Sequence, residues 1–177
     1  MAEGDAVSQM DETAQRIVQR FSLRPHPEGG FYRETYRSDF LVQHPRIPSG
    51  APAERAAATF IYYLLADDQI SAFHRVKWTD EVWHLYAGGP LELHLIDGDG
   101  VYRVVMLTSA LEDGEPSAVV PAGWWQAARL PPGTPWAFGG CSVAPGFDFI
   151  DFEMPRADEL LEQFPQHASL IRALARR

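Results

Sequence analysis

The stretch that decides the fold runs from Ser71 to Leu95 and reads SAFHRVKWTDEVWHLYAGGPLELHL. A second informative stretch, from Val119 to Leu130, reads VVPAGWWQAARL. Both contain short apolar runs rich in β-branched and aromatic residues, separated by Gly, Pro and Asp, and this pattern predicts strands joined by tight turns. His74 and Glu81 stand on either side of the first predicted turn. The two stretches therefore predict a β-structure that carries two titratable side chains on neighbouring strands.

The same type of pattern continues through most of the chain. Turn signals such as GG, DGDG, EDGEP and PPG separate further short runs, and regular spacing of this kind is typical of an all-β sandwich or barrel of the jelly-roll type. Helical spacing of apolar residues appears only near the two ends, over about 11–23 and 157–176. The predicted strands after residue 58 cover 59–66, 71–76, 81–87, 91–96, 101–107, 117–122, 124–130, 135–144 and 147–154.

Three segments before residue 58 need separate interpretation. The segment 29–38, GGFYRETYRS, alternates with period two, so Tyr32, Glu34 and Tyr36 are expected to share one face of a strand. We interpret the preceding HPEGG turn as loop geometry, because its glycines relieve backbone constraints. The segment 40–54 is rich in Pro, His and Arg and is predicted to be a loop.

Composition limits the classes of partner. The 177 residues are 46% hydrophobic, which predicts one domain, 1–177, with a full core. The net charge of −9 would repel phosphate backbones and anionic lipid surfaces, so neither nucleic acid nor membrane is expected as a partner. Cys141 is the only cysteine, and an intrachain disulfide is therefore impossible. The acidic start lacks the pattern of a signal peptide, and we expect a soluble cytoplasmic protein.

Four ordered motifs together resemble the Cupin_5 family: HPEGGFYRETYRS, SAFHRVKWTDEVWHLYAGGPLELHLI, VVPAGWWQAARL and VAPGFDFIDFE. They span about 23–153. The resemblance implies a cupin jelly roll, or double-stranded β-helix, in a family of mostly unassigned activity whose members are commonly homodimers. The strand 29–38, which could pair across a two-fold axis, is consistent with a homodimer.

The cupin pattern also shows what is missing. Cupins that bind a metal carry the signature His-x-His-x(4)-Glu and a further His, but here Val76 stands at the second His and Gln126 at the last one. Imidazoles supply most of the affinity for iron, manganese or nickel in such sites. We therefore expect no metal cofactor, the alternative being a divalent ion held by His74, Glu81 and Gln126.

Without a metal, the remaining chemistry is proton transfer. A His beside a carboxylate in a partly dry pocket can exchange protons with a substrate, which makes His74, Glu81 and Tyr63 the candidate catalytic residues. Aromatic, amide and carboxylate side chains elsewhere in the predicted barrel are candidates for binding a small-molecule substrate, although the tryptophans would equally suit a core or a dimer interface. The candidate substrate-binding residues are Gln126, Trp83, Trp124, Glu34, Tyr36, Phe138 and Asp148.

Several functions remain open at this level. An aromatic and acidic pocket would suit a cationic ring, and hence a Pictet-Spengler-like cyclisation or condensation of an aromatic amine in biosynthesis; an epimerase or isomerase of a small ring-bearing metabolite is equally compatible. A nucleotide-sugar would need basic clamps, for which Arg33, Arg37, Arg75 and Arg129 are available. The alternatives to a metal-independent acid/base enzyme are a non-catalytic small-molecule-binding cupin and a metal-dependent enzyme with a degenerate site.

Overall fold

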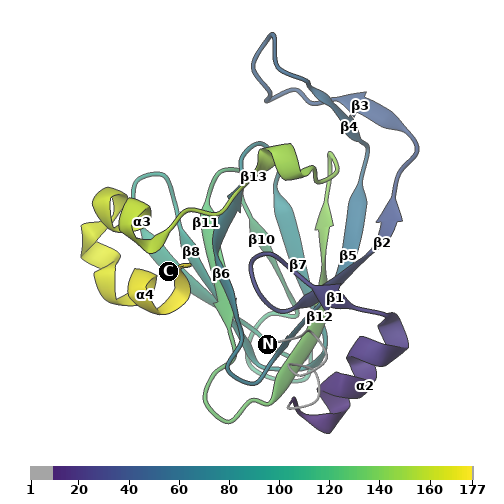
Figure 1. Ribbon diagram of the computed structural model, residues 1–177, viewed down its shortest axis with the longest axis vertical. Coiled ribbons are helices and arrows are strands. Elements are labelled where there is room, and N and C mark those ends of the chain that lie inside the picture. Colours follow the sequence, from purple (N-terminus) through teal and green to yellow (C-terminus); the bar gives the residue numbers. More distant parts are fainter. Residues whose placement is uncertain (1–9, 177) are drawn as a thin grey trace.

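The computed structural model describes residues 10–176 and has two antiparallel β-sheets that face each other (Figure 1). The strand order is β1-β2-β5-β12-β7-β10 in one sheet and β13-β6-β11-β8-β9 in the other, and β3 pairs with β4 in a separate hairpin. The strands are β1 (Arg24–Pro25), β2 (Phe31–Arg37), β3 (Leu41–Gln43), β4 (Glu54–Ala56), β5 (Thr59–Ala66), β6 (Ile70–Val76), β7 (Glu81–Gly88), β8 (Leu91–Ile96), β9 (Tyr102–Leu107), β10 (Ser117–Val120), β11 (Trp125–Arg129), β12 (Trp136–Val143) and β13 (Phe152–Glu153). This arrangement confirms the predicted all-β cupin jelly roll.

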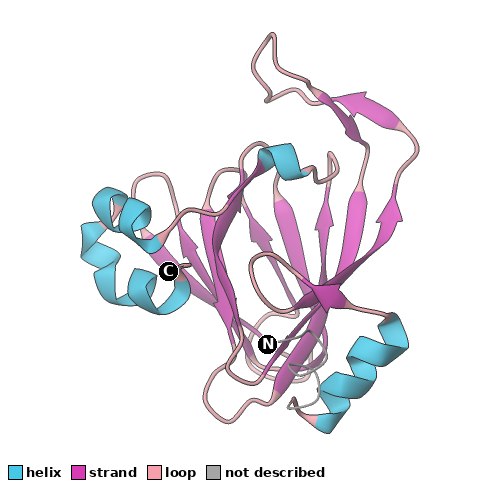
Figure 2. Cartoon of the chain, in the orientation of Figure 1, coloured by secondary structure: helices cyan, strands magenta, loops and turns pink. Residues whose placement is uncertain are grey.

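Helices cover the outer faces of the two sheets (Figure 2). Helix α2 (Glu12–Phe21) begins at Asp11, whose side chain caps the first turn, and it packs against the first sheet through a cluster that includes Phe138. Helices α3 (Ala157–Gln163) and α4 (Ala168–Leu174), joined by the 3₁₀ turn η2 (Pro165–His167), pack against the second sheet. The predicted terminal helices are thus present, and among residues 10–176 no helix is long and apolar enough to cross a membrane.

Alternation along the strands decides what lies between the sheets. Tyr63, Trp83 and Leu93 point inward and belong to one buried apolar cluster, whereas their sequence neighbours face the outer helices or solvent. The cluster fills one end of the barrel. At the other end β5 and β7 begin and β6 and β12 end, and there the interior is lined by polar side chains.

Two predicted segments fold differently from expectation. The segment 40–54, predicted to be a loop, contains β3 and the first residue of β4, and these two strands form a hairpin that projects from the barrel in Figure 1. The segment 147–154, predicted to be one strand, instead forms the 3₁₀ turn η1 (Phe149–Asp151) followed by the two-residue strand β13. Asp148 caps η1 by accepting a hydrogen bond from the Ile150 amide, and a side chain that competes for backbone donors in this way favours a turn over an extended strand.

Strand β2 contains a β-bulge that changes the predicted faces. Glu34 pairs with Ile61, but Tyr36 pairs with Phe60, so one additional residue, Thr35, is inserted on β2. An inserted residue reverses the direction of every later side chain. Tyr36 therefore points outward and is 54% exposed, while Arg37 points toward the interior. The prediction that Tyr36 shares a face with Tyr32 and Glu34 was wrong for this reason.

Candidate active site

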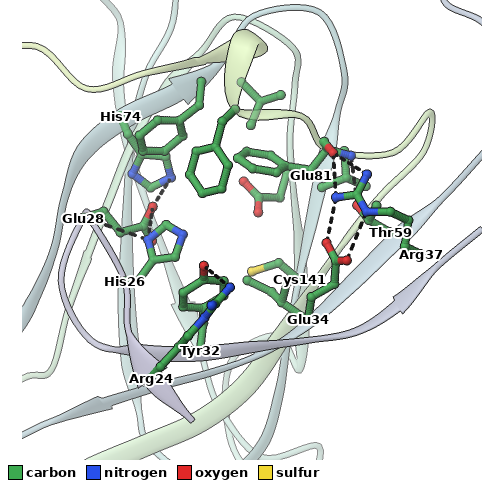
Figure 3. A pocket seen from close by; sticks show the side chains of 16 residues that line it. Arg24, His26, Glu28, Tyr32, Glu34, Arg37, Thr59, His74, Glu81 and Cys141 are labelled. Atoms are coloured by element: carbon green, nitrogen blue, oxygen red, sulfur yellow. Dashed lines mark hydrogen bonds and ion pairs between the residues drawn. The ribbon is translucent and has the colours of Figure 1, made fainter. Parts of the chain in front are cut away.

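The polar end of the barrel encloses a cavity of about 130 Å³ (Figure 3). Residues from both sheets, from the HPEGG turn and from the segment after β12 line it. Its lining consists of Arg24, His26, Glu28, Tyr32, Glu34, Arg37, Thr59, Ile61, His74, Val76, Glu81, Cys141, Val143, Phe147, Phe149 and Phe152. Of the residues predicted from sequence to form the site, His74, Glu81 and Glu34 line this cavity.

His74 lies between a backbone carbonyl oxygen and a carboxylate. Its Nδ1 lies 2.8 Å from the carbonyl oxygen of Ala72, and its Nε2 lies 3.2 Å from Oε2 of Glu28. Because a carbonyl oxygen can only accept a hydrogen bond, Nδ1 donates to Ala72, and Nε2 is the ring nitrogen beside Glu28. Phe152 stacks on the same ring with centroids 5.3 Å apart. These contacts fix the orientation of His74 in the wall of the cavity.

Glu28 is the carboxylate that anchors His74, and the HPEGG turn places it there. Gly29 has φ +111°, and a Cβ at this position would collide with the carbonyl oxygen of Ile70, so the turn can lie against β6 only with glycine. Ser71 Oγ donates to Glu28 Oε1 at 2.8 Å, and His26 Nδ1 lies 3.3 Å from Oε2.

The environment of Glu28 keeps its carboxyl ionised. Burial alone would raise its pKa, but the charges of His74 and His26, with hydrogen bonds from His26 and Ser71, lower the pKa to about 2. Glu28 therefore carries a negative charge at any physiological pH, and this charge lies beside the His74 ring inside the barrel.

Glu81, on the opposite sheet, has a different environment. Burial raises the pKa of its carboxyl, and the Glu28 charge adds to this, although His74 and a hydrogen bond from Gln126 act in the opposite direction. In the described part of the chain Glu81 forms no salt bridge. Cys141 lies beside it, and burial raises the pKa of this thiol well above its ordinary value. Glu81 is thus a carboxyl poised to gain and lose a proton.

Gln126 connects the two sheets behind the cavity. It lies opposite His74 in the pairing of β11 with β6 and reaches across the interior to β7. Trp83 Nε1 donates to its Oε1 at 2.8 Å, and its Nε2 donates to Glu81 Oε2 at 2.6 Å. Because an indole N–H can only donate, Trp83 fixes the orientation of the amide. Gln126 therefore presents a donor to Glu81 and holds one carboxyl oxygen in place.

The same geometry argues against the divalent metal that the cupin fold implies. The Gln126 carbonyl oxygen, its only ligating atom, is already bound by Trp83, and His74 Nε2 faces Glu28. Val76 offers no lone pair. Across residues 10–176 no three His, Cys, Asp or Glu side chains gather as a metal site, and His84 and His94 point away from the cavity toward Ser142 and Tyr102. The donor set does not fit a transition metal.

Aromatic rings cover the mouth of the cavity. Phe147, Phe149 and Phe152 come from the segment that follows β12, and their ring centroids lie between 5.0 and 6.0 Å from one another. Two arginines are among the groups that tether this segment. Arg37 donates to the Phe147 carbonyl oxygen at 3.1 Å, and the buried Asp151 forms two hydrogen bonds with Arg55 at 2.7 and 2.8 Å.

The other predicted site residues lie outside the cavity lining. Tyr63 is buried in the core and donates to the Gly29 carbonyl oxygen at 2.6 Å, and burial raises the pKa of its phenol well above the ordinary value. Trp83 and Gln126 stand behind Glu81 and act on that carboxyl. Trp124 precedes β11 and lies under the guanidinium of Arg103 at 5.1 Å.

Three further residues predicted to contact a substrate also lie outside the cavity lining. Phe138 has outward parity on β12 and stacks on Phe21 of α2 with centroids 5.0 Å apart. Asp148 serves as the cap of η1. Tyr36 is turned outward by the β2 bulge.

Sequence reasoning missed His26 and Glu28, because the HPEGG turn was interpreted as loop geometry alone. A His and a Glu placed two residues apart, directly before two glycines, were the available signal. Glycine in a strained turn also marks close approach of the backbone to another segment. That approach brings Glu28 to Ser71 and His74, and the Ala72 amide donates to the Glu28 carbonyl oxygen at 2.8 Å.

Comparison with known proteins identifies the family. The model of Cupin_5, described as Cupin superfamily (DUF985), matches residues 15–155. The chain belongs to the Cupin_5 family. Among curated proteins it is similar to the uncharacterized protein YML079W of Saccharomyces cerevisiae, with 30% identity over 173 residues that cover 91% of this chain and 85% of the relative.

Two solved structures of similar sequence share this Cupin_5 fold. A hypothetical protein from Leishmania major has a TM-score of 0.83 and 34% identity, covering 93% of this chain and 99% of its own. Protein SO0799 from Shewanella oneidensis has a TM-score of 0.79 and 34% identity, covering 92% of this chain and 97% of its own. The fold over more than nine-tenths of this chain is therefore common to these relatives.

Proposed function

We propose that this Cupin_5 protein is a metal-independent acid/base enzyme that acts on a small ring-bearing metabolite, with His74 as the proton donor and Glu81 as the proton acceptor. The observation that carries the proposal is the contrast between their environments. His74 donates through Nδ1 to the Ala72 carbonyl oxygen and has its Nε2 beside the Glu28 carboxylate, whereas Glu81 is buried without a salt bridge among the described residues and has a raised pKa. Titratable groups whose environments separate their protonation behaviour in this way are typical acid and base pairs.

The positions of the two groups suit transfer of a proton across a ring. His74 belongs to β6 and Glu81 to β7, which lie in opposite sheets, and both line the same cavity (Figure 3). A substrate between them would lose a proton from carbon to the Glu81 carboxylate and receive one from His74 at another atom or face. The reaction is then an isomerisation or epimerisation, in which the proton removed equals the proton returned.

The size and lining of the cavity support a substrate with one ring. A cavity of about 150 Å³ holds a benzene molecule in a protein core, and the space here is about 130 Å³. Phe147, Phe149 and Phe152 place aromatic surface at its mouth. Planar rings pack well against such side chains, which contribute roughly 0.5–1.5 kcal/mol per pair beyond area burial.

Two of the substrates considered from sequence are less well supported. Three of the four arginines considered as a basic clamp for a nucleotide-sugar lie outside the cavity lining. Arg33 lies over Tyr62 on the outer face, Arg75 pairs with Glu153 and Arg129 pairs with Glu92. The fourth, Arg37, lines the cavity but is bound to Glu34. An acidic pocket would favour the cyclisation of an aromatic amine. However, the carboxylate of Glu28 has His74 as its partner and that of Glu34 has Arg37, so the pocket offers less negative charge to a cationic amine than its carboxylates alone suggest.

The proposal is tested by exchange of carbon-bound hydrogen with solvent. Wild-type protein is incubated in D₂O with a panel of enolisable ring ketones and free hexoses, and loss of each C–H signal is followed by ¹H NMR. We expect catalysed exchange with at least one compound, lowered about 10²–10⁴-fold in His74→Gln and in Glu81→Gln. His84→Gln is the matched control, because His84 lies on the outer face and bonds to Ser142.

Two results would contradict the proposal. Exchange that persists unchanged in a folded His74→Gln, Glu81→Gln double variant would exclude these residues from the chemistry. Binding of panel compounds to wild-type protein without any exchange would instead establish a non-catalytic binding cupin, the other function class that this cavity supports.

A further inference from the structure

The charges that line the cavity can be paired one by one. Glu28 is matched by His74, whose Nε2 lies 3.2 Å from its carboxylate. Glu34 is matched by Arg37, which donates to both carboxylate oxygens at 3.0 and 2.7 Å. Glu81 is buried and forms no salt bridge among the described residues. The lining thus contains three carboxyls, and two of them have a basic side chain as partner.

Arg24 is left over from this pairing. It lines the cavity, and no salt bridge among residues 10–176 involves it. It is nevertheless held in place. Strands β1 and β2 pair Arg24 with Tyr32, an Arg24 N–H donates to the Tyr32 hydroxyl at 3.0 Å, and the guanidinium lies 5.0 Å from the centroid of the Tyr32 ring.

A guanidinium held on an aromatic face is prepared to bind an anion. It has five N–H donors, of which the Tyr32 contact uses one. Because the fork of a guanidinium matches the two oxygens of a carboxylate, a carboxylate ligand could take two parallel hydrogen bonds from it. The stacking on Tyr32 lowers the entropy that the side chain would lose on binding.

We propose that Arg24 anchors an anionic group of the substrate, and that the substrate class is therefore a small ring-bearing carboxylate. The carboxylate binds at Arg24, and the ring lies against the phenyl groups at the mouth. The position of the reacting carbon between His74 and Glu81 rests on the proposed function, whereas the anchoring by Arg24 does not. The site therefore selects for a negative charge on the ligand, opposite to the cationic ring suggested by the acidic composition.

Three probes with the same ring and different charge test this selection: benzoate, benzamide and benzylamine. Their dissociation constants are measured by NMR titration with wild-type protein, Arg24→Gln, Arg24→Lys and Arg33→Gln. Arg33 is the matched control, because it lies on the outward side of the same strand pair, 5.8 Å from the Tyr62 ring. Equal melting temperatures of the variants and wild type ensure that folded proteins are compared.

We expect wild-type protein to bind benzoate at least tenfold more tightly than benzamide and to bind benzylamine most weakly, since a hydrogen-bonded charge typically contributes enough for this ratio. Arg24→Gln should abolish the preference for benzoate, and Arg24→Lys should reduce it by keeping the charge without the fork. Arg33→Gln should keep it.

Several outcomes would overturn the proposal. The first is that benzamide or benzylamine binds to wild-type protein as tightly as benzoate. The second is that no probe binds, and the third is that the Arg24→Gln variant still prefers benzoate. If Arg24→Gln does not fold, an Arg24→Lys preference equal to that of wild type refutes the role of the guanidinium fork. A benzoate preference without solvent exchange in any compound would refute the proposed function alone, and exchange without a benzoate preference would refute the Arg24 assignment alone.

Discussion

Replacement of Glu28 by Gln tests the central electrostatic feature of the site. The substitution keeps the size of the side chain and removes the negative charge that faces His74 and His26. In the fold the pKa of the Glu28 carboxyl is about 2, against an ordinary value of 4.5. Since each pKa unit corresponds to about 1.4 kcal/mol, the ionised carboxylate contributes about 3 kcal/mol to the free energy of unfolding.

The pH dependence has a defined direction. Because the pKa of Glu28 is lower in the folded than in the unfolded state, the stabilisation is fully present above pH 4.5 and is lost as the pH falls from there toward 2. We therefore expect Glu28→Gln to be about 3 kcal/mol less stable than wild type at pH 6, where unfolded histidines are largely protonated. The difference should shrink to about 1 kcal/mol near pH 3.

Urea unfolding followed by circular dichroism measures the free-energy difference between Glu28→Gln and wild type at both pH values. At neutral pH the melting temperature of the variant should be about 6–12 °C lower than that of wild type. Glu34→Gln is the matched control, because its partly exposed ion pair with Arg37 should contribute only about 0–1 kcal/mol. A loss below about 1 kcal/mol for Glu28→Gln at pH 6, or a difference that persists unchanged at pH 2.5, would refute the reasoning from charge pairing.

Two further predictions concern stability. Burial raises the pKa of Glu81, so the ionised carboxylate destabilises the fold. Glu81→Gln should therefore be at least as stable as wild type at pH 8 in urea unfolding, and the difference in the free energy of unfolding should narrow as the pH falls toward 4.5. A clear loss of stability at pH 8 would disprove this. Asp151→Asn breaks the buried pair with Arg55, whose side chains are 4% and 5% exposed, and should cost about 3–5 kcal/mol. The control is Asp158→Asn, at an exposed ion pair with Arg156, which should change the free energy of unfolding by less than about 1 kcal/mol. Equal effects of the two substitutions would show that burial of the Asp151–Arg55 pair is unimportant.

The strands were predictable where alternation is uninterrupted. The run 91–96 forms β8 with the predicted bounds, and 59–66 forms β5 likewise, because period-two burial is a property of consecutive residues. The inserted residue Thr35 was not predictable in the same way. It changes no local propensity, yet it moves Arg37 inward and Tyr36 outward. The turn η1 was missed for a similar reason, since its cap depends on one hydrogen bond that the Asp148 side chain accepts from the Ile150 amide.

The candidate site was predictable only in part. The cupin spacing of His74 and Glu81 made both candidates for the pocket, and both line the cavity. The role of Gln126 differs from expectation, because its contact with Trp83 turns the amide toward Glu81 instead of toward a ligand. Tyr63 has the right parity but lies deeper in the barrel, where it bonds to the HPEGG turn.

A cupin barrel without the imidazoles of a metal site could be predicted from the amino-acid sequence, because glycine and proline positions, strand periodicity and the residues Val76 and Gln126 are all local properties. The distribution of the charges, in contrast, depends on tertiary packing. Glu28 reaches His74 across a long sequence separation, and Arg24 is left without an acidic partner among the described residues. The energy of a buried charge depends on which charges lie within a few ångströms of it, and those neighbours are selected by the packing of the turn against the sheet.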